Sequence, residues 1–152
     1  MHLTRDDRYT IENNLSNNIS LKQIGRNINK HCSCISREIK NHYITKNTGS
    51  VGRKFNNCLY RRTCSNRGKN CNLKNCTAFI EEKCPILSKP PYVCNGCKKR
   101  NQCTLSKRFY DASYAQDEYE ETLKESRSGI VIDQDEINYL NSILTPLIKE
   151  HG

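Results

Sequence analysis

The chain of 152 residues has little material for a large hydrophobic core. Hydrophobic residues make up 35% of it, and the mean hydropathy is −0.84. No apolar run approaches the roughly 18 residues that a membrane-spanning helix needs, so we expect no membrane partner. The N-terminal MHLTRDDRYT also lacks the basic and then apolar stretches of a signal peptide. These absences indicate a cytoplasmic protein built from small units.

Acidic residues are scarce in the first 110 positions and abundant afterwards. Residues 1–110 hold 22 Lys and Arg against 6 Asp and Glu, a net charge of +16, whereas residues 111–152 hold 3 against 10, a net charge of −7. A basic front part of this kind is typical of proteins that bind a polyanion. Together with the cysteine pattern described below, it predicts three parts, residues 1–45, 46–110 and 111–152.

Capping signals predict three short helices in residues 1–45. Thr4 and Asp7 form a capping-box pattern before the first helix, and Ser20 and Gln23 form another before the second. Gly25 lies inside the second helix, where it costs about 1 kcal/mol relative to alanine. We therefore expect the third helix to approach the second closely at this glycine.

The third helix is expected to begin near residue 32 and to bury Ile35 and Ile39, four residues apart. Its other face is polar and basic, as in the recognition helix of a helix-turn-helix domain, whose short polar side chains and arginines reach base edges in the major groove. The predicted DNA contacts are Lys30, His31, Ser33, Cys34, Ser36, Arg37 and Lys40, the first two to phosphates. The alternative is a basic face that only contacts solvent.

These residues carry a family resemblance. Thr4, Arg8 and Ile11 match a T-x-x-x-R-x-x-I opening, and residues 36–39 match an S-R-E-I recognition helix. Residues 2–15 and 20–42 thus resemble the N-terminal helix-turn-helix of bacterial transposases of the insertion-sequence-thirty (IS-thirty) family. The chain differs in carrying Cys32 and Cys34 where proline and threonine are common in that family.

Eight cysteines dominate residues 46–110, a polar and basic stretch with few aliphatic residues. They are Cys58, Cys64, Cys71, Cys76, Cys84, Cys94, Cys97 and Cys103. Eight thiolates suit two structural four-cysteine zinc sites, which would supply the folding energy that the stretch lacks. The simplest grouping assigns the first four to one ion and the last four to another, with interleaved grouping as an alternative. Disulfides and a redox-active pair are further alternatives, favoured less in a cytosolic chain without a βαβ pattern.

The sequence Cys94-Asn-Gly-Cys97 has the two-residue spacing of a zinc knuckle, with a turn that lets both sulfurs face one ion. The surrounding KPPYVCNGCKKRNQCTLSKRFYDASYAQDEY resembles an insertion in one branch of the same transposase family. With the front end included, the resemblance spans about residues 2–130. It implies binding of double-stranded DNA at terminal inverted repeats, a homo-oligomer in the complete transposase, and a location at the bacterial nucleoid.

Two helices are expected in the C-terminal part of the chain, the first of which begins before residue 111. One would run from Thr104 to Arg127, and the next would begin after Asp133, capped with Glu136, and be interrupted at Pro146. The last helix resembles the start of a second helix-turn-helix. In the family this precedes a ribonuclease-H-like catalytic domain with magnesium, which the sequence up to Gly152 does not contain, so we expect no enzyme activity from this chain alone.

The sequence therefore predicts a mainly α protein with a three-helix helix-turn-helix, a small zinc-stabilised cysteine-rich module and C-terminal helices. Its predicted function is sequence-specific DNA binding as the recognition part of a transposase for DNA transposition. Two other functions stay open. One is a zinc-containing transcription regulator, and the other is a zinc-stabilised protein-interaction adaptor.

Overall fold

The chain divides into two compact units, Met1–Glu118 and Tyr119–Gly152. The computed structural model describes residues 2–65, 74–127, 129 and 133–151. The first unit holds both the expected helix-turn-helix and the cysteine-rich segment, so the predicted borders at residues 45 and 110 do not coincide with this division. Within the described residues, no helix has the length and apolar character needed to cross a bilayer.

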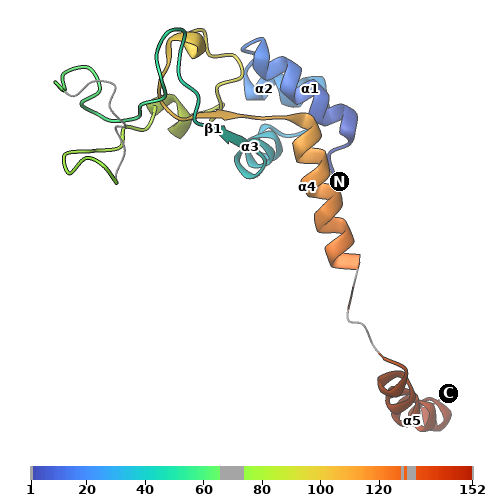
Figure 1. Cartoon of the computed structure of the whole chain (residues 1–152). Coiled ribbons are helices and arrows are strands. Elements are labelled where there is room, and N and C mark those ends of the chain that lie inside the picture. The colour runs from blue at the N-terminus through green and yellow to red at the C-terminus, as the bar shows by residue number, and fades with distance from the viewer. Residues whose placement is uncertain (1, 66–73, 128, 130–132, 152) are drawn as a thin grey trace. The chain divides into compact units, whose positions relative to one another are not determined.

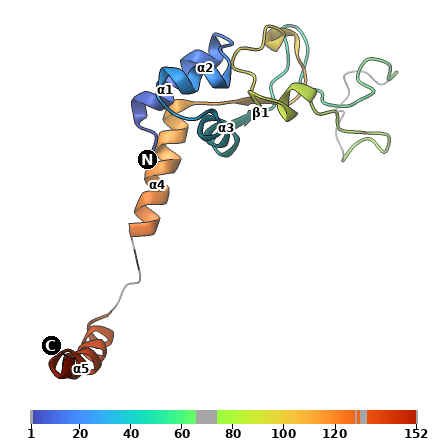
Figure 2. The ribbon, with the colours of Figure 1, turned by 180° about the vertical axis from the view of Figure 1, so that it is seen from behind.

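Three helices open the first unit and lie side by side in Figures 1 and 2: α1 (Arg5–Ser16), α2 (Leu21–Asn27) and α3 (Cys32–Asn41). The capping box before α1 is confirmed, because the backbone N–H of Asp7 donates to Thr4 Oγ1 (3.1 Å) and that of Thr4 to Asp7 Oδ2 (2.9 Å). Before α2 only half a box forms. Ser20 Oγ accepts from the Gln23 N–H, whereas the Gln23 side chain donates to Asn27.

The close approach predicted at Gly25 is confirmed. A Cβ atom at this position would lie 2.5 Å from the carbonyl oxygen of Lys30 and 3.3 Å from the backbone nitrogen of Cys32. The Lys30 N–H donates to the Gly25 carbonyl at 2.8 Å, and Asn29 takes the left-handed conformation (φ 52°) in the turn between α2 and α3. The glycine therefore fixes the short distance between these two helices.

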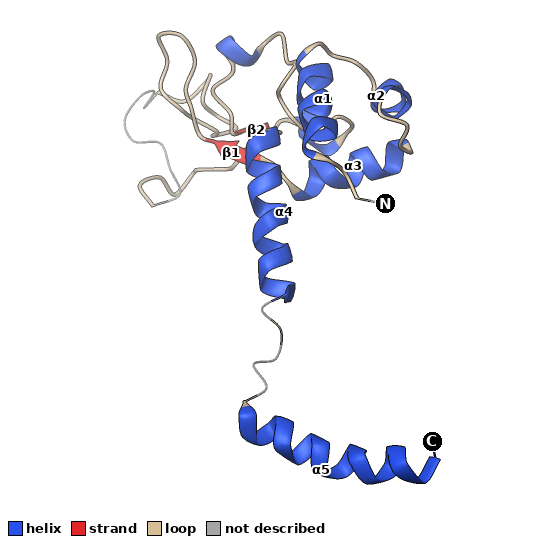
Figure 3. Ribbon diagram, turned by 90° about the vertical axis from the view of Figure 1, so that its right-hand side faces the viewer, coloured by secondary structure: helices blue, strands red, loops and turns tan. Residues whose placement is uncertain are grey.

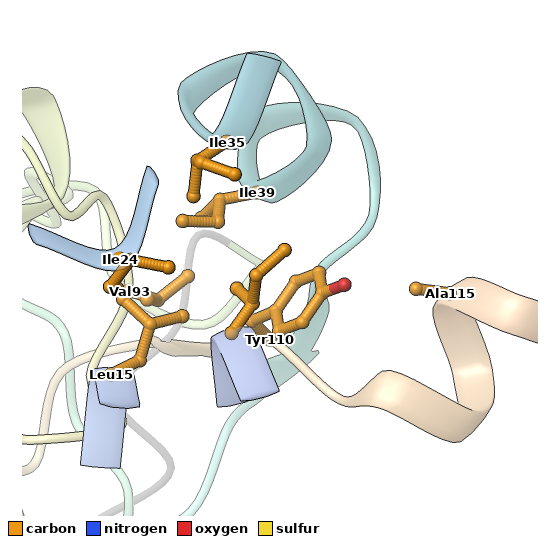
Figure 4. Packing of buried hydrophobic residues seen from close by; sticks show 8 residues of the cluster. Leu15, Ile24, Ile35, Ile39, Val93, Tyr110 and Ala115 are labelled. Atoms are coloured by element: carbon orange, nitrogen blue, oxygen red, sulfur yellow. The ribbon is translucent and has the colours of Figure 1, made fainter. Parts of the chain in front are cut away.

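A hydrophobic core joins the three helices to a later part of the first unit. Five of its buried residues lie in α1, α2 and α3, the expected Ile35 and Ile39 among them, and three come from later in the chain. The cluster consists of Ile11, Leu15, Ile24, Ile35, Ile39, Val93, Tyr110 and Ala115. In Figure 4, Ile35 and Ile39 point from α3 toward Ile24 and Val93, with Tyr110 beside them. The segment that contains Val93 and Tyr110 thus completes the core of the three-helix domain.

A two-stranded antiparallel sheet follows α3 and was not predicted from the sequence. Strand β1 (Ile44–Lys46) pairs with β2 (Lys107–Phe109), with Ile44 opposite Phe109 (Figure 3). The expected helix start at Thr104 is therefore wrong, because residues 107–109 gain backbone partners in β1. Helix α4 (Ala112–Arg127) begins only after Asp111, whose side chain accepts from the Tyr114 N–H at 2.9 Å.

The Cys94–Cys97 turn packs against the helix-turn-helix. It closes with a hydrogen bond from the Cys97 N–H to the Cys94 carbonyl (3.1 Å), as its Asn-Gly sequence predicts. Asn95 binds both backbone groups of Tyr110, at 2.8 and 2.9 Å. A Cβ atom at Gly96 would lie 2.6 Å from the carbonyl oxygen of Leu15 in α1. The glycine is thus needed for packing as well as for the turn. Two short 3-10 helices, η1 (Pro85–Ser88) and η2 (Arg100–Gln102), flank this region.

A buried ion pair joins α1 to α3 and both to the later segment. Arg8, 2% exposed, donates from Nε to Glu38 Oε1 at 2.7 Å. The same carboxylate oxygen accepts from the Tyr110 hydroxyl at 3.1 Å, and a second Arg8 nitrogen donates to Gln116 of α4 at 2.7 Å. Burial raises the pKa of Tyr110, and the charge of Glu38 raises it further, so the hydroxyl stays a donor.

The second unit contains the end of α4 and helix α5 (Gln134–His151). Asp133 caps α5 as expected, because its carboxylate accepts from the Glu136 N–H at 2.8 Å. The expected interruption at Pro146 is wrong, because α5 continues through it. A proline removes one backbone donor from a helix and can be accommodated by a kink. Several apolar side chains of α5 are exposed, namely Ile137, Tyr139, Leu140, Ile143, Leu144 and Ile148.

A chain limited to residues 1–45 is expected to be much less stable than one limited to residues 1–118. The shorter chain loses Val93 and Tyr110 from its core, and full burial of an apolar side chain contributes about 1.5–3 kcal/mol. Thermal unfolding followed by circular dichroism would compare them. Equal melting temperatures would show that the later segment does not stabilise the three helices.

Glu38→Ala is expected to lower the free energy of unfolding by about 3 kcal/mol, because it leaves the Arg8 guanidinium buried without its carboxylate. Tyr110→Phe is the matched control, since it removes one hydrogen bond to the same oxygen and should cost about 1 kcal/mol. Urea unfolding of both variants measures the difference. A Glu38→Ala protein as stable as the unchanged one would contradict the structural role given to this pair.

Candidate nucleic-acid interface

Helix α3 has one buried and one exposed face. Ile35, Glu38 and Ile39 are buried, as expected for the two isoleucines. Most of the predicted DNA contacts lie on the exposed side: His31, Ser33, Cys34, Arg37 and Lys40 are exposed, and Lys30 and Ser36 are half-buried. The structure thus brings the predicted residues together on one surface, while their contacts to bases and phosphates stay predictions.

His31 begins this surface as the N-terminal cap of α3. Its Nδ1 atom accepts from the Ser33 N–H at 3.3 Å and lies 2.7 Å from the Ser33 hydroxyl. The cap thus occupies the Ser33 N–H, and the Cys34 N–H donates to the His31 carbonyl, but the positive end of the helix dipole still favours a phosphate at this end of α3. The geometry agrees with a phosphate contact near His31 and base contacts further along the helix.

Residues 90–92 border the same surface, which the sequence did not predict. A pocket of about 480 Å³ is lined by Ser33 and Ser36 of α3 and also by Pro90 and Pro91. Nearby, the Lys40 ammonium lies 4.4 Å from the centre of the Tyr92 ring, within the range of a cation–π contact. Only the tertiary fold brings these residues together, because Pro90 comes 49 positions after Asn41, the last residue of α3.

Three cysteines of the predicted later group, Cys84, Cys97 and Cys103, act on the fourth, Cys94. Burial raises the pKa of the Cys94 thiol, a backbone hydrogen bond with Arg108 lowers it, and the neighbouring thiols of Cys97, Cys84 and Cys103 raise it further. The thiols of Cys84, Cys97 and Cys103 therefore each lie near enough to Cys94 to act on it. This placement agrees with the predicted grouping of the last four cysteines.

Only three cysteines of the predicted first group, Cys58, Cys64, Cys71 and Cys76, are among the described residues. Cys58 is buried, and its backbone pairs with that of Glu81. Cys64 and Cys76 are half-buried, and Cys71 lies outside the described residues. Cys58 and Cys103 both lie near Arg61, because the thiols of both add to the effect of Glu82 in raising the pKa of Arg61. Interleaved grouping of the cysteines therefore stays open.

The described cysteines do not by themselves define a metal centre. All nine of them are free thiols, which gives the disulfide alternative no support. Across residues 2–65, 74–127, 129 and 133–151, no three Cys, His, Asp or Glu side chains are arranged to hold a metal ion. Soft thiol donors gathered around Cys94 fit zinc chemically, but the zinc module stays a prediction.

Comparison with known proteins agrees with the geometry of the first three helices. A family model described as a helix-turn-helix domain, of a type found in transposases, matches residues 1–42. No curated protein and no solved structure matches the chain. The matched range ends at His42, directly after α3, so it covers the three helices and the candidate surface. The chain therefore carries an N-terminal helix-turn-helix domain, which suggests that it binds DNA.

Proposed function

We propose that this chain recognises specific DNA sequences as the N-terminal part of a transposase and that its targets are the terminal inverted repeats of a mobile element. The observation that carries the proposal is the exposed face of α3, where Arg37 and Lys40 project from a helix whose other face is fixed in the core. An arginine so placed can bind the O6 and N7 atoms of guanine in the major groove.

The net charge of residues 1–110 supports this role. With a net charge of +16, this part of the chain would attract the phosphate backbone, and the attraction would be independent of sequence. The proposed division of labour is therefore that α3 reads bases while cations elsewhere in the first unit hold the backbone. We propose a binding role for these residues and assign the cutting and joining of DNA to a separate catalytic domain.

We also propose that zinc draws the cysteines of residues 58–103 together. The support comes from the three thiols near Cys94 and from the scarcity of buried apolar residues among the described residues of this segment. Bound zinc would supply a tetrahedral cross-link of thiolates. Through Val93 and Gly96, which contact the helix-turn-helix, such a cross-link would also steady the position of residues 90–92 beside α3.

Arg37→Ala is expected to weaken binding to a preferred sequence by about 1–3 kcal/mol and to change binding to random DNA much less. The preferred sequence would first be selected from randomised duplexes, and gel-shift titrations would then measure both affinities. Arg26→Ala, at an exposed arginine of α2, is the matched control and should not change the ratio of the two affinities. Equal losses on both DNAs in the Arg37→Ala protein would show that α3 does not read bases.

The selected sequence also separates the proposed functions. Sequences related to the inverted ends of a mobile element would support the transposase role, whereas promoter-like sites would favour a transcription regulator. Zinc binding without any selected sequence would favour the adaptor.

The protein purified under reducing conditions is expected to hold about two zinc ions per chain. Cys97→Ser should remove one of them, because it takes a ligand from the group around Cys94. Cys34→Ser, at an exposed cysteine of α3, is the control and should keep both ions. Native mass spectrometry counts the bound metal. An unchanged zinc content in the Cys97→Ser protein would contradict the proposed ligand set.

A further inference from the structure

A second pocket in the first unit is lined by cations and has no residue of α3 in its wall. It has a volume of about 470 Å³, and its wall includes Lys46 of β1, Lys107 and Phe109 of β2, and Arg100 of η2. No carboxylate is among its described lining residues. Three positive charges around one hollow, without acidic neighbours in its wall, create a potential that attracts an anion.

The aromatic ring of Phe109 brings two of these cations to the same place. The Lys46 ammonium lies 5.6 Å and the Arg100 guanidinium 6.0 Å from the centre of this ring. Cation–π contacts at such distances offset part of the repulsion between the two charges. Both side chains are also exposed, so both can move toward a ligand at the mouth of the pocket.

Lys107 contributes a charge that is almost fully buried. It is 3% exposed, and its ammonium donates to the carbonyl oxygens of Thr48 (2.6 Å) and Gly49 (3.0 Å) and to the Thr48 hydroxyl (3.2 Å). These groups satisfy its hydrogen bonds but carry no full negative charge. In the part of the chain that the structure describes, no carboxylate forms an ion pair with Lys107. A bound anion would supply the missing counter-charge.

The wall also contains an unused hydrogen-bonding group. The Ser50 hydroxyl is buried and has no hydrogen-bond partner among the described residues. Its segment is held in place, because the Ser50 N–H donates to the Arg53 carbonyl (2.9 Å) and the Val51 N–H to the Asn101 carbonyl (3.1 Å). A hydroxyl, a guanidinium and an ammonium around one hollow are the donors that bind a tetrahedral oxyanion such as phosphate.

The position of the pocket in the chain links it to the proposed DNA surface. Lys46 follows the last residue of α3, Asn41, by five positions. Five extended residues span at most about 17 Å, which is comparable with the major-groove width of about 12 Å. The pocket is thus close enough to the end of α3 for one duplex to contact both, and the inference below assumes that it does.

From these observations we propose that the pocket formed by Lys46, Arg100, Lys107 and Ser50 binds one backbone phosphate of the DNA, next to the bases that α3 reads. This inference rests on the proposed function. It adds a specific anchoring site, and so predicts that the register of the protein on DNA depends on β1 and η2 as well as on α3.

The double variant Lys46→Ala/Arg100→Ala tests the inference, since both side chains are exposed and their removal leaves the core intact. Its slope of log affinity against log salt concentration should be shallower by about 0.9, as expected for one lost phosphate contact, on preferred and random DNA alike. The control is Lys98→Ala/Lys99→Ala, which removes the same charge from exposed positions next to Arg100 but outside the pocket. An equal change in the control, or none in the pocket variant, would overturn the inference.

A titration with inorganic phosphate separates this inference from the proposed function. The amide signals of Ser50, Val51 and Asn101 should shift and saturate in the unchanged protein and stay constant in the pocket variant. Saturation together with no binding to any DNA would leave an anion pocket but refute both the DNA role and the assigned ligand. If the unchanged protein binds DNA but its amide signals do not saturate with phosphate, and the salt slope of the pocket variant is unchanged, only the pocket inference is refuted.

Discussion

The buried hydrogen-bonded pair of Arg8 and Glu38 is the interaction on which the first unit most depends. It connects α1 with α3 inside the core, and Tyr110 and Gln116 extend it to the segment that follows the cysteines. An ion pair of this kind gives little net stability compared with apolar residues, but it penalises every arrangement that leaves one charge alone. The orientation of α3, and hence the direction of its exposed residues, follows from this penalty.

The same constraint explains why the helix-turn-helix and the cysteine-rich segment form one unit. Tyr110 donates to Glu38 and also fills the core, while Gly96 allows the Cys94–Cys97 turn to pack on α1. Residues 90–92 are thereby carried to the edge of the candidate DNA surface. The cysteine-rich segment thus shapes the candidate DNA surface through its packing against the helices. Under the zinc proposal, bound zinc would affect DNA recognition through this packing.

Local features of the sequence were enough to predict the three helices, and contacts distant in sequence explain what was missed. The capping box at Thr4 and the spacing of Ile35 and Ile39 depend on neighbours within four residues, so both were predicted correctly. The strand at residues 107–109 depends on a partner some 60 positions earlier and resembled the start of a helix. Gly96 was assigned to a turn, but its contact with Leu15 could not be foreseen from a two-residue spacing.

For the candidate site, the sequence predicted which residues α3 exposes but not what surrounds them. The most direct test of the central claim is a titration of the full chain with its selected duplex, followed residue by residue in amide NMR spectra. The account predicts that the largest changes occur at the exposed residues of α3, foremost Ser33, Cys34 and Arg37. Changes confined to α5 or to the cysteine-rich segment, with α3 unaffected, would contradict it.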